Sequence, residues 1–257
     1  MVAELCITSN FTFLTGASHP EDYMRRAALD GIEAIAIADD NSVAGIVRAH
    51  TEAREIARRV RERQRFDAQQ GLIGPPVPQG WPPAPAAASA AIYNTPRLLP
   101  AARLVFTDAP PITALAATRQ GWASLCRLLS KGRLRAEKGK CILSLADIFE
   151  HSDGVQLILH TDDQALRSQR GAGGWSEHMP RLTRRFSGQM HLALTPRYDG
   201  QDEMHFWAIS DLAEQLGLPL LASATPRMHH GRRRRLADVL SAIRTGKRID
   251  RLGRDAL

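Results

Sequence analysis

The order of hydrophobic and polar positions predicts strands that alternate with helices from the start of the chain. Residues 3–8 alternate as in a short strand, with Leu5 and Ile7 on one face. Residues 20–30 have the apolar spacing of an amphipathic helix. Residues 32–38 form an apolar run that is typical of a strand buried on both faces. This order is the opening of a βα barrel or a doubly wound fold.

The same alternation continues along the rest of the chain. The predicted helices cover residues 43–64, 114–129, 144–150, 202–216 and 232–245, and the predicted strands cover residues 103–106, 155–159, 190–194 and 218–223. The last quarter contains a strand, a helix that Gly217 ends, and a further strand, which together form a βαβ unit. We therefore predict one α/β domain over residues 1–246 and the start of a linker over residues 247–257.

Residues 67–97 interrupt this pattern. The stretch 67–100 holds eight of the fifteen prolines and has no helical or strand periodicity. We predict a Pro/Ala-rich surface insertion without regular structure, which limited proteolysis should cut first. The alternative is a peptide docking segment in which Trp81 or Tyr93 is the anchor.

Composition narrows the class of protein. The chain is 44% hydrophobic and 24% charged, which is ordinary for a globular domain. It has no apolar run near the ~20 residues that span a bilayer and does not open with a signal peptide. The three cysteines form no C-x-x-C pattern. We therefore expect a cytoplasmic protein with reduced thiols and no membrane contact.

The net charge of +7 has two interpretations: a protein that works near nucleic acid, or an arginine-rich composition from a GC-rich coding sequence. Cations are concentrated in residues 130–140 and at the start of the last predicted helix, where they oppose the helix dipole. The candidate contacts to nucleic acid or to a protein partner are Lys131, Arg133, Arg135, Lys138, Arg232, Arg233, Arg234 and Arg235. A solvated turn is the alternative for the first group, and an acidic neighbouring domain is an alternative partner for the second.

Three separated stretches carry a family resemblance. Residues 4–50, 121–140 and 216–249 resemble, in the same order, the PHP (polymerase and histidinol phosphatase) domain of bacterial error-prone, ImuC-type homologues of the DNA polymerase III alpha subunit. The resemblance implies a distorted seven-stranded βα barrel at the N-terminus of a DNA-directed DNA polymerase, a nucleotidyltransferase. It also implies a role in translesion synthesis, DNA repair and damage-induced mutagenesis.

Active PHP domains hold up to three metal ions at the carboxyl ends of the strands. The resemblance places their ligand positions on Cys6, Thr8, Asp39, Asp40, Arg103, Thr225 and Arg227. Of these, only Asp39 keeps the family residue. An arginine stays protonated in a protein and repels a cation, so we predict a degenerate site with no metal ligand and no catalytic residue. Water-mediated Mg²⁺ binding at Asp39 and Asp40 is the alternative.

The lost metals leave two carboxylates to be neutralised. We predict that Arg103 or Arg227 forms an ion pair with Asp39 or Asp40. Removing that arginine is expected to destabilise the domain by a few kcal/mol. Within this segment we expect no cofactor, and Mg²⁺ belongs only to the absent polymerase domains.

The sequence favours a non-catalytic PHP domain that supports the polymerase and presents an interaction surface. Its partners would be the remaining polymerase domains, DNA through the parent enzyme and, by resemblance, the sliding clamp and translesion accessory proteins. One alternative is a metal-dependent phosphoesterase or proofreading exonuclease, which needs the missing ligands. The other is a stand-alone basic nucleic-acid-binding module, which only the charge supports.

Overall fold

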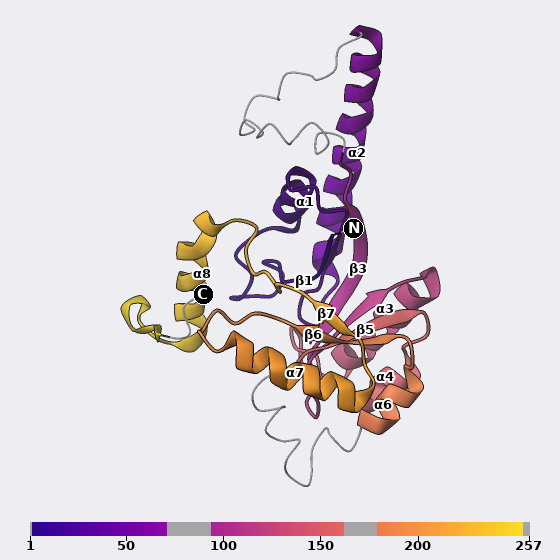
Figure 1. Cartoon of the computed structure of the whole chain (residues 1–257), viewed down its shortest axis with the longest axis vertical. Coiled ribbons are helices and arrows are strands. Elements are labelled where there is room, and N and C mark those ends of the chain that lie inside the picture. Colours follow the sequence, from indigo (N-terminus) through magenta and orange to yellow (C-terminus); the bar gives the residue numbers. More distant parts are fainter. Residues whose placement is uncertain (1, 71–93, 162–178, 254–257) are drawn as a thin grey trace.

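A computed structural model of the chain describes residues 2–70, 94–161 and 179–253. Its centre is one curled sheet of seven strands in sequence order (Figure 1). The strands are β1 (Ala3–Ile7), β2 (Ala34–Ile37), β3 (Arg97–Leu104), β4 (Ile112–Ala116), β5 (Val155–Leu159), β6 (Met190–Leu194) and β7 (Leu220–Ala222). β4 runs antiparallel to β3 and β5, and the other neighbours are parallel. The predicted fold class, a seven-stranded barrel-like α/β domain, is confirmed.

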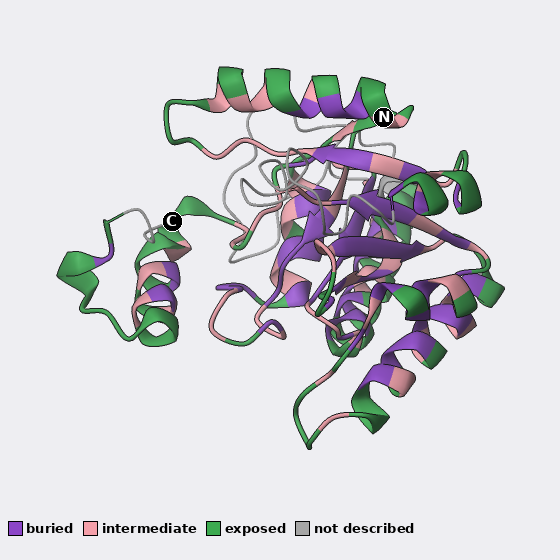
Figure 2. Cartoon of the chain, turned by 90° about the horizontal axis from the view of Figure 1, so that it is seen from below, coloured by how far each residue is buried: buried purple, intermediate pink, exposed green. Residues whose placement is uncertain are grey.

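Helices cover the outside of the sheet. They are α1 (Pro20–Leu29), α2 (Ala44–Gln70), α3 (Arg119–Leu134), α4 (Leu145–Glu150), α6 (Met179–Arg185), α7 (Asp202–Leu216) and α8 (Arg234–Thr245), with 3₁₀ turns η4 (Gly231–Arg233) and η5 (Ile249–Arg251). Buried residues gather in the strands, and α8 stands apart from the sheet (Figure 2). Among the described residues, no helix combines the length and apolar character that crossing a bilayer requires.

The buried side chains form three clusters. Cys6, Ala36, Ala101 and Ala193, from four different strands, share one cluster with the larger Leu115 and Ile158. The two further clusters combine strand residues with the apolar faces of the helices. Neighbouring residues along a strand fall into different clusters because their side chains point to opposite faces of the sheet.

Side-chain and loop contacts join the two edge strands. The Glu4 carboxylate on β1 accepts hydrogen bonds from the Ser223 hydroxyl and, at 2.9 Å, from the Ala224 amide. The Thr8 amide donates to the Pro226 carbonyl at 3.0 Å. The segment after β7 therefore lies against β1, and it brings the sequence-distant ends of the chain to the same side of the sheet.

One predicted helix is partly wrong. The prediction of a helix over residues 114–129 included Leu115, but Leu115 belongs to β4, and α3 begins at Arg119. β4 pairs with a strand on both sides, so five consecutive residues gain ladder hydrogen bonds that the local apolar run does not reveal. Thr118 then caps α3 by accepting a hydrogen bond from the Gly121 amide at 3.0 Å.

Other element limits also differ from the sequence prediction. α2 reaches Gln70, so the first four residues assigned to the insertion are helical. β3 begins at Arg97 rather than at residue 103. Residues 71–93 of the insertion, which include Trp81 and Tyr93, lie outside the described residues. At the other end, η5 and the 4% exposed Leu252 show that the predicted linker is partly folded onto the domain.

Candidate functional site

The candidate site lies where β1 and β2 end, because parallel strands bring their carboxyl ends to one edge of the sheet. Asp39 follows β2 and is 1% exposed. Its carboxylate accepts hydrogen bonds from the Ser9 amide at 2.8 Å, the Ser9 hydroxyl at 2.7 Å and the Thr12 hydroxyl at 2.9 Å. Ser9 and Thr12 belong to the loop after β1, so this loop holds the Asp39 carboxylate in place.

Burial raises the pKa of Asp39, and the hydrogen bonds from Ser9 and Thr12 limit that rise. All three donors are uncharged. Asp39 is therefore not the aspartate that forms the predicted ion pair with an arginine. The sequence analysis missed the roles of Ser9 and Thr12. The available signal was their position: hydroxyl side chains directly after a strand lie at the same sheet edge as Asp39.

Asp40 has the ionic partner that Asp39 lacks. The Arg103 guanidinium lies 2.9 Å from the Asp40 carboxylate, and each side chain is 34% exposed. Backbone hydrogen bonds fix this geometry, because the Arg103 amide donates to the Asp39 carbonyl and the Asn41 amide donates to the Arg103 carbonyl. The predicted pairing of Arg103 with this aspartate pair is therefore confirmed.

Cys6 and Thr8, which the resemblance places at two of the family's ligand positions, are both buried. Cys6 is 4% exposed, and burial raises the pKa of its thiol to about 11. A thiol with that pKa stays protonated at neutral pH, and only a thiolate is a strong nucleophile or metal ligand. The Thr8 backbone bonds with the segment after β7, as described above, and its carbonyl accepts from the Tyr23 hydroxyl at 3.1 Å.

Thr225 and Arg227 follow β7. Thr225 has a positive φ of 42°, and its amide donates to the Ser223 hydroxyl at 3.1 Å. The Arg227 carbonyl accepts from the Ala17 amide at 2.7 Å, which ties this segment to the loop after β1. Among the described residues, Arg227 forms no ion pair with Asp39 or Asp40. Desolvation and the neighbouring Arg244 and Arg103 lower the pKa of its guanidinium.

A second polar pair lies further along the sheet. The Thr113 hydroxyl on β4 lies 2.8 Å from Nε2 of His160, which follows β5. Burial and Arg103 lower the pKa of His160 to about 3, so the imidazole is neutral. Across the described parts of the chain, no three His, Cys, Asp or Glu residues lie close enough together to share a metal ion.

The structure separates the cations that the sequence grouped together. Lys131 and Arg135 bind Asp147 at 3.0 and 2.7 Å, and Lys131 also contacts Glu150, so these two cations have carboxylate partners within the domain. Arg133 instead donates to the Asn41 carbonyl at 3.0 Å. Lys138 has no ion pair in the described residues. Two of the four cations in the first group, Lys131 and Arg135, therefore form ion pairs within the domain. Arg133 and Lys138 have no carboxylate partner among the described residues.

The arginines before α8 form a different surface. η4 holds Arg232 and Arg233, and α8 begins at Arg234, two residues later than predicted. Arg233 lies 3.6 Å from Asp22 of α1. Within the described ranges, Arg232, Arg234 and Arg235 have no ion pair. Figure 1 places α8 and α3 on opposite sides of the sheet, so the two basic groups do not form one surface.

Comparison with known proteins finds relatives that are much longer than this chain. The error-prone DNA polymerase of Ruegeria pomeroyi is 42% identical over 99% of this chain and 22% of its own length. That of Rhodopseudomonas palustris (strain BisB5) is 37% identical over 98% of this chain and 19% of its own length. The chain thus spans about a fifth of these relatives.

A more distant match is the solved structure of an amidohydrolase from Chromobacterium violaceum. It has 11% sequence identity and a TM-score of 0.48, and the alignment covers 89% of this chain and 88% of that one. The sequence profile of the PHP domain matches residues 4–165, which is more than half of the chain. The resemblance inferred from the sequence is therefore confirmed, and this chain belongs to the PHP domain family.

Proposed function

We propose that this chain is a non-catalytic, metal-free PHP domain of a cytoplasmic error-prone DNA polymerase, in which it supports the other domains during translesion synthesis. The ion pair between Arg103 and Asp40 carries the proposal. A guanidinium at the strand ends supplies the positive charge that a metal ion would supply, and it cannot lose its proton to become a ligand.

The neighbouring residues support the same conclusion. Three hydrogen bonds from Ser9 and Thr12 occupy most of the acceptor sites of the Asp39 carboxylate, which leaves little of it for a metal. Cys6 is held in its protonated form by burial. The residues at this edge therefore do not fit a site in which several imidazoles and carboxylates converge on cations.

The support role rests on an exposed apolar face. Leu236, Val239 and Ile243 on α8 are 41%, 40% and 59% exposed, and their spacing places them on one side of the helix. About four fifths of the length of the relatives lies outside the part that this chain matches. We propose that the remaining polymerase domains cover this face and that nucleotidyl transfer belongs to them.

Elemental analysis tests the metal-free state. The chain, purified without chelator and then dialysed against Zn²⁺ or Mn²⁺, is expected to hold well below one metal ion per molecule. Arg103→Glu restores one family ligand only, so neither metal binding nor phosphoesterase activity on a nitrophenyl phosphate ester is expected to return. Stoichiometric metal in the unaltered chain would refute the proposal.

The support role has its own test. Val239→Asp and Ile243→Asp lie on exposed positions, so the isolated chain should keep its melting temperature. In a complete polymerase, the same two changes should lower the melting temperature and the polymerase activity. If the complete enzyme tolerates both aspartates, this face is not a domain contact.

A further inference from the structure

The outer side of α7 exposes large apolar side chains. This helix lies against the outside of the sheet (Figure 1), and its inner side buries Ile209 and Leu212. On the outer side, Met204 and Trp207 are 66% and 72% exposed, and their spacing of three residues makes them neighbours on the helix surface. Tryptophan is mostly buried in folded proteins, so an exposed tryptophan beside an exposed methionine marks a candidate interaction surface.

The loop before α7 displays a further aromatic ring. Tyr198 is 82% exposed and has a φ of 56°, in the left-handed region that residues other than glycine rarely adopt. The Asp202 carboxylate holds this conformation by accepting hydrogen bonds from the Arg197 amide at 2.7 Å and the Tyr198 amide at 3.1 Å. Asp202 is the first residue of α7, so Tyr198 is fixed at the end of the helix that carries Met204. Backbone strain that displays an aromatic side chain to solvent is a further indication of function.

The charged residues around these apolar side chains are all negative. Residues 198–226 contain no lysine or arginine, although the net charge of the chain is +7. They contain five carboxylates: Asp199, Asp202, Glu203, Asp211 and Glu214. Glu203 and Asp211 each lie four residues from Trp207, so they border it on both sides along the helix. The exposed apolar side chains therefore have an acidic border.

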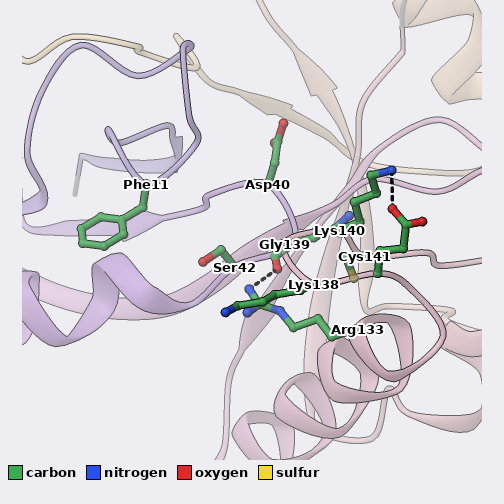
Figure 3. A pocket seen from close by; sticks show the side chains of 10 residues that line it. Phe11, Asp40, Ser42, Arg133, Lys138, Gly139, Lys140 and Cys141 are labelled. Carbon is green, nitrogen blue, oxygen red and sulfur yellow. Dashed lines mark hydrogen bonds and ion pairs between the residues drawn. The ribbon is translucent and has the colours of Figure 1, made fainter.

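These carboxylates differ from those on the basic parts of the domain. Glu137, in the turn after α3, is paired with Lys140 at 2.9 Å (Figure 3). Glu203, Asp211 and Glu214 are exposed and form no ion pair with any residue that the structure describes. Their negative charge is therefore available to a cationic partner.

The acidic border limits what can bind to this side of α7. It repels anionic ligands such as nucleic acid and acidic lipid headgroups, and it attracts lysine and arginine side chains. Electrostatic attraction of this kind steers the encounter of two separate molecules. Permanent contacts are more apolar than contacts that form and dissociate, in which a polar rim surrounds the apolar centre. An acidic border around a small apolar centre therefore fits a separate polypeptide that binds reversibly.

We propose that the α7 face, which consists of Tyr198, Met204, Trp207 and the bordering carboxylates, docks a separate protein through a cationic segment with apolar side chains. The apolar side chains of that segment contact Met204 and Trp207, and its lysines or arginines pair with Glu203, Asp211 and Glu214. This inference depends neither on the absence of metal nor on the proposed contact of α8, because it uses residues of neither surface.

A model partner tests the charge requirement. The probe is a fluorescein-labelled amphipathic helix of leucine and lysine, about 18 residues or five turns long, and its binding to the 257-residue chain is measured by anisotropy at low salt. Asp211→Lys/Glu214→Lys should weaken binding at least about tenfold, because it reverses charges that face the peptide. The control Glu137→Lys/Asp153→Lys changes the net charge equally at exposed positions elsewhere and should change affinity less than about twofold.

A second peptide, of leucine and glutamate, shows whether the loss depends on the charge of the partner. Its binding should not weaken in Asp211→Lys/Glu214→Lys, because this variant removes negative charge from the surface. The melting temperature of each variant should match that of the unaltered chain, since the changes lie at exposed positions. Failure of the leucine–lysine peptide to bind, or equal losses in the two double variants, would overturn the proposal.

Tryptophan fluorescence reports where the peptide binds. Burial of Trp207 should move its emission to shorter wavelength, and Trp207→Phe should lose most of this shift while it keeps affinity within about twofold. Trp207→Ala should bind about tenfold more weakly. The control Leu134→Ala, at an 88% exposed apolar position beside Arg133 and Arg135, should leave binding unchanged. A shift that persists in Trp207→Phe would place the peptide elsewhere and would refute the assignment.

Two further measurements identify the occupant. A complete polymerase should bind the leucine–lysine peptide as tightly as the 257-residue chain does, because a separate partner leaves the α7 face open in the free enzyme. Loss of binding in the complete enzyme would assign the face to the remaining polymerase domains. A dimer of the chain in sedimentation experiments that Asp211→Lys/Glu214→Lys dissociates would assign it to a second copy. Either result would overturn the proposal, and neither changes the outcome expected for Val239→Asp and Ile243→Asp on α8.

Discussion

Asp39 after β2 and Asp147 in the first turn of α4 are both buried aspartates with several hydrogen-bond donors, and the donors differ in charge. Among the described residues, the hydrogen-bond donors to the Asp39 carboxylate are one backbone amide and two hydroxyl groups. The Asp147 side chain is 3% exposed and binds Arg135 through two bonds of 2.7 and 2.8 Å. Lys131 lies 3.0 Å from the same carboxylate.

This difference sets the two pKa values in opposite directions. Burial raises the pKa of Asp39, and its neutral donors offset only part of that effect. Burial also opposes ionisation of Asp147, but the hydrogen bonds from Arg135, the Ser144 amide and Lys131 outweigh it, so the pKa of Asp147 is lowered. The comparison teaches that Asp39 is buried among uncharged donors, whereas Asp147 in the same domain is held by two cations.

The largest effect is expected at Asp147. Asp147→Asn should destabilise the domain by about 3 kcal/mol, because it leaves Arg135 and Lys131 without their carboxylate and weakens the cap of α4. Chemical denaturation at pH 7 measures this loss. The control Asp153→Asn removes a 72% exposed partner of Arg185 and should cost less than about 0.5 kcal/mol.

The pH dependence at Asp147 follows from its lowered pKa. A group with a depressed folded-state pKa contributes its full stability above its unfolded pKa, which is about 3.9 for aspartate, and loses it as the pH falls through the folded value. The difference between the unaltered chain and Asp147→Asn should therefore be constant from pH 7 to about pH 5 and shrink below pH 4. A difference that grows on acidification would contradict the ionic account.

An intermediate effect is expected at Arg103. Sequence reasoning gave a few kcal/mol for its removal, but both partners are a third exposed, so solvent weakens the pair. Arg103→Gln should cost about 1 kcal/mol in denaturation experiments. The matched control Arg185→Gln breaks the more exposed pair with Asp153 and should cost less. A loss above about 3 kcal/mol for Arg103→Gln would mean that Asp40 depends on this cation as strongly as Asp147 depends on Arg135.

The family resemblance predicted seven strands, and the sequence named Arg103 or Arg227 as the ionic partner of Asp39 or Asp40. Local patterns alone predicted six of the strands. They did not predict β4, because the run from Ile112 to Ala116 obtains its partners from β3 and β5, which lie elsewhere in the chain. They also did not separate Lys131 from Arg133. Their carboxylate and carbonyl partners come from α4 and the β2–α2 loop, and sequence spacing along α3 carries no information about either.

The smallest effect at neutral pH is expected for Asp39→Asn. The amide oxygen of asparagine can still accept from the Ser9 amide and the Thr12 hydroxyl, and the amide nitrogen can donate to the Ser9 hydroxyl, so the three contacts survive. The change also removes the cost of burying a charge, and the net loss at pH 7 should stay below about 1 kcal/mol. Asp39→Ala, which leaves buried donors unpaired, should cost about 3 kcal/mol and shows that the position itself matters.

The sign of the pH dependence distinguishes Asp39 from Asp147. A raised folded-state pKa means that the protonated carboxyl favours the folded chain, and that contribution is complete below the unfolded pKa and is lost as the pH rises through the folded value. Asp39→Asn lacks this loss, so its cost relative to the unaltered chain should fall as the pH rises from about 4 to 7. Asp147→Asn should show the opposite slope. If both variants become more costly toward neutral pH, the hydrogen bonds from Ser9 and Thr12 outweigh burial and stabilise Asp39 as an ion, which would contradict the raised pKa.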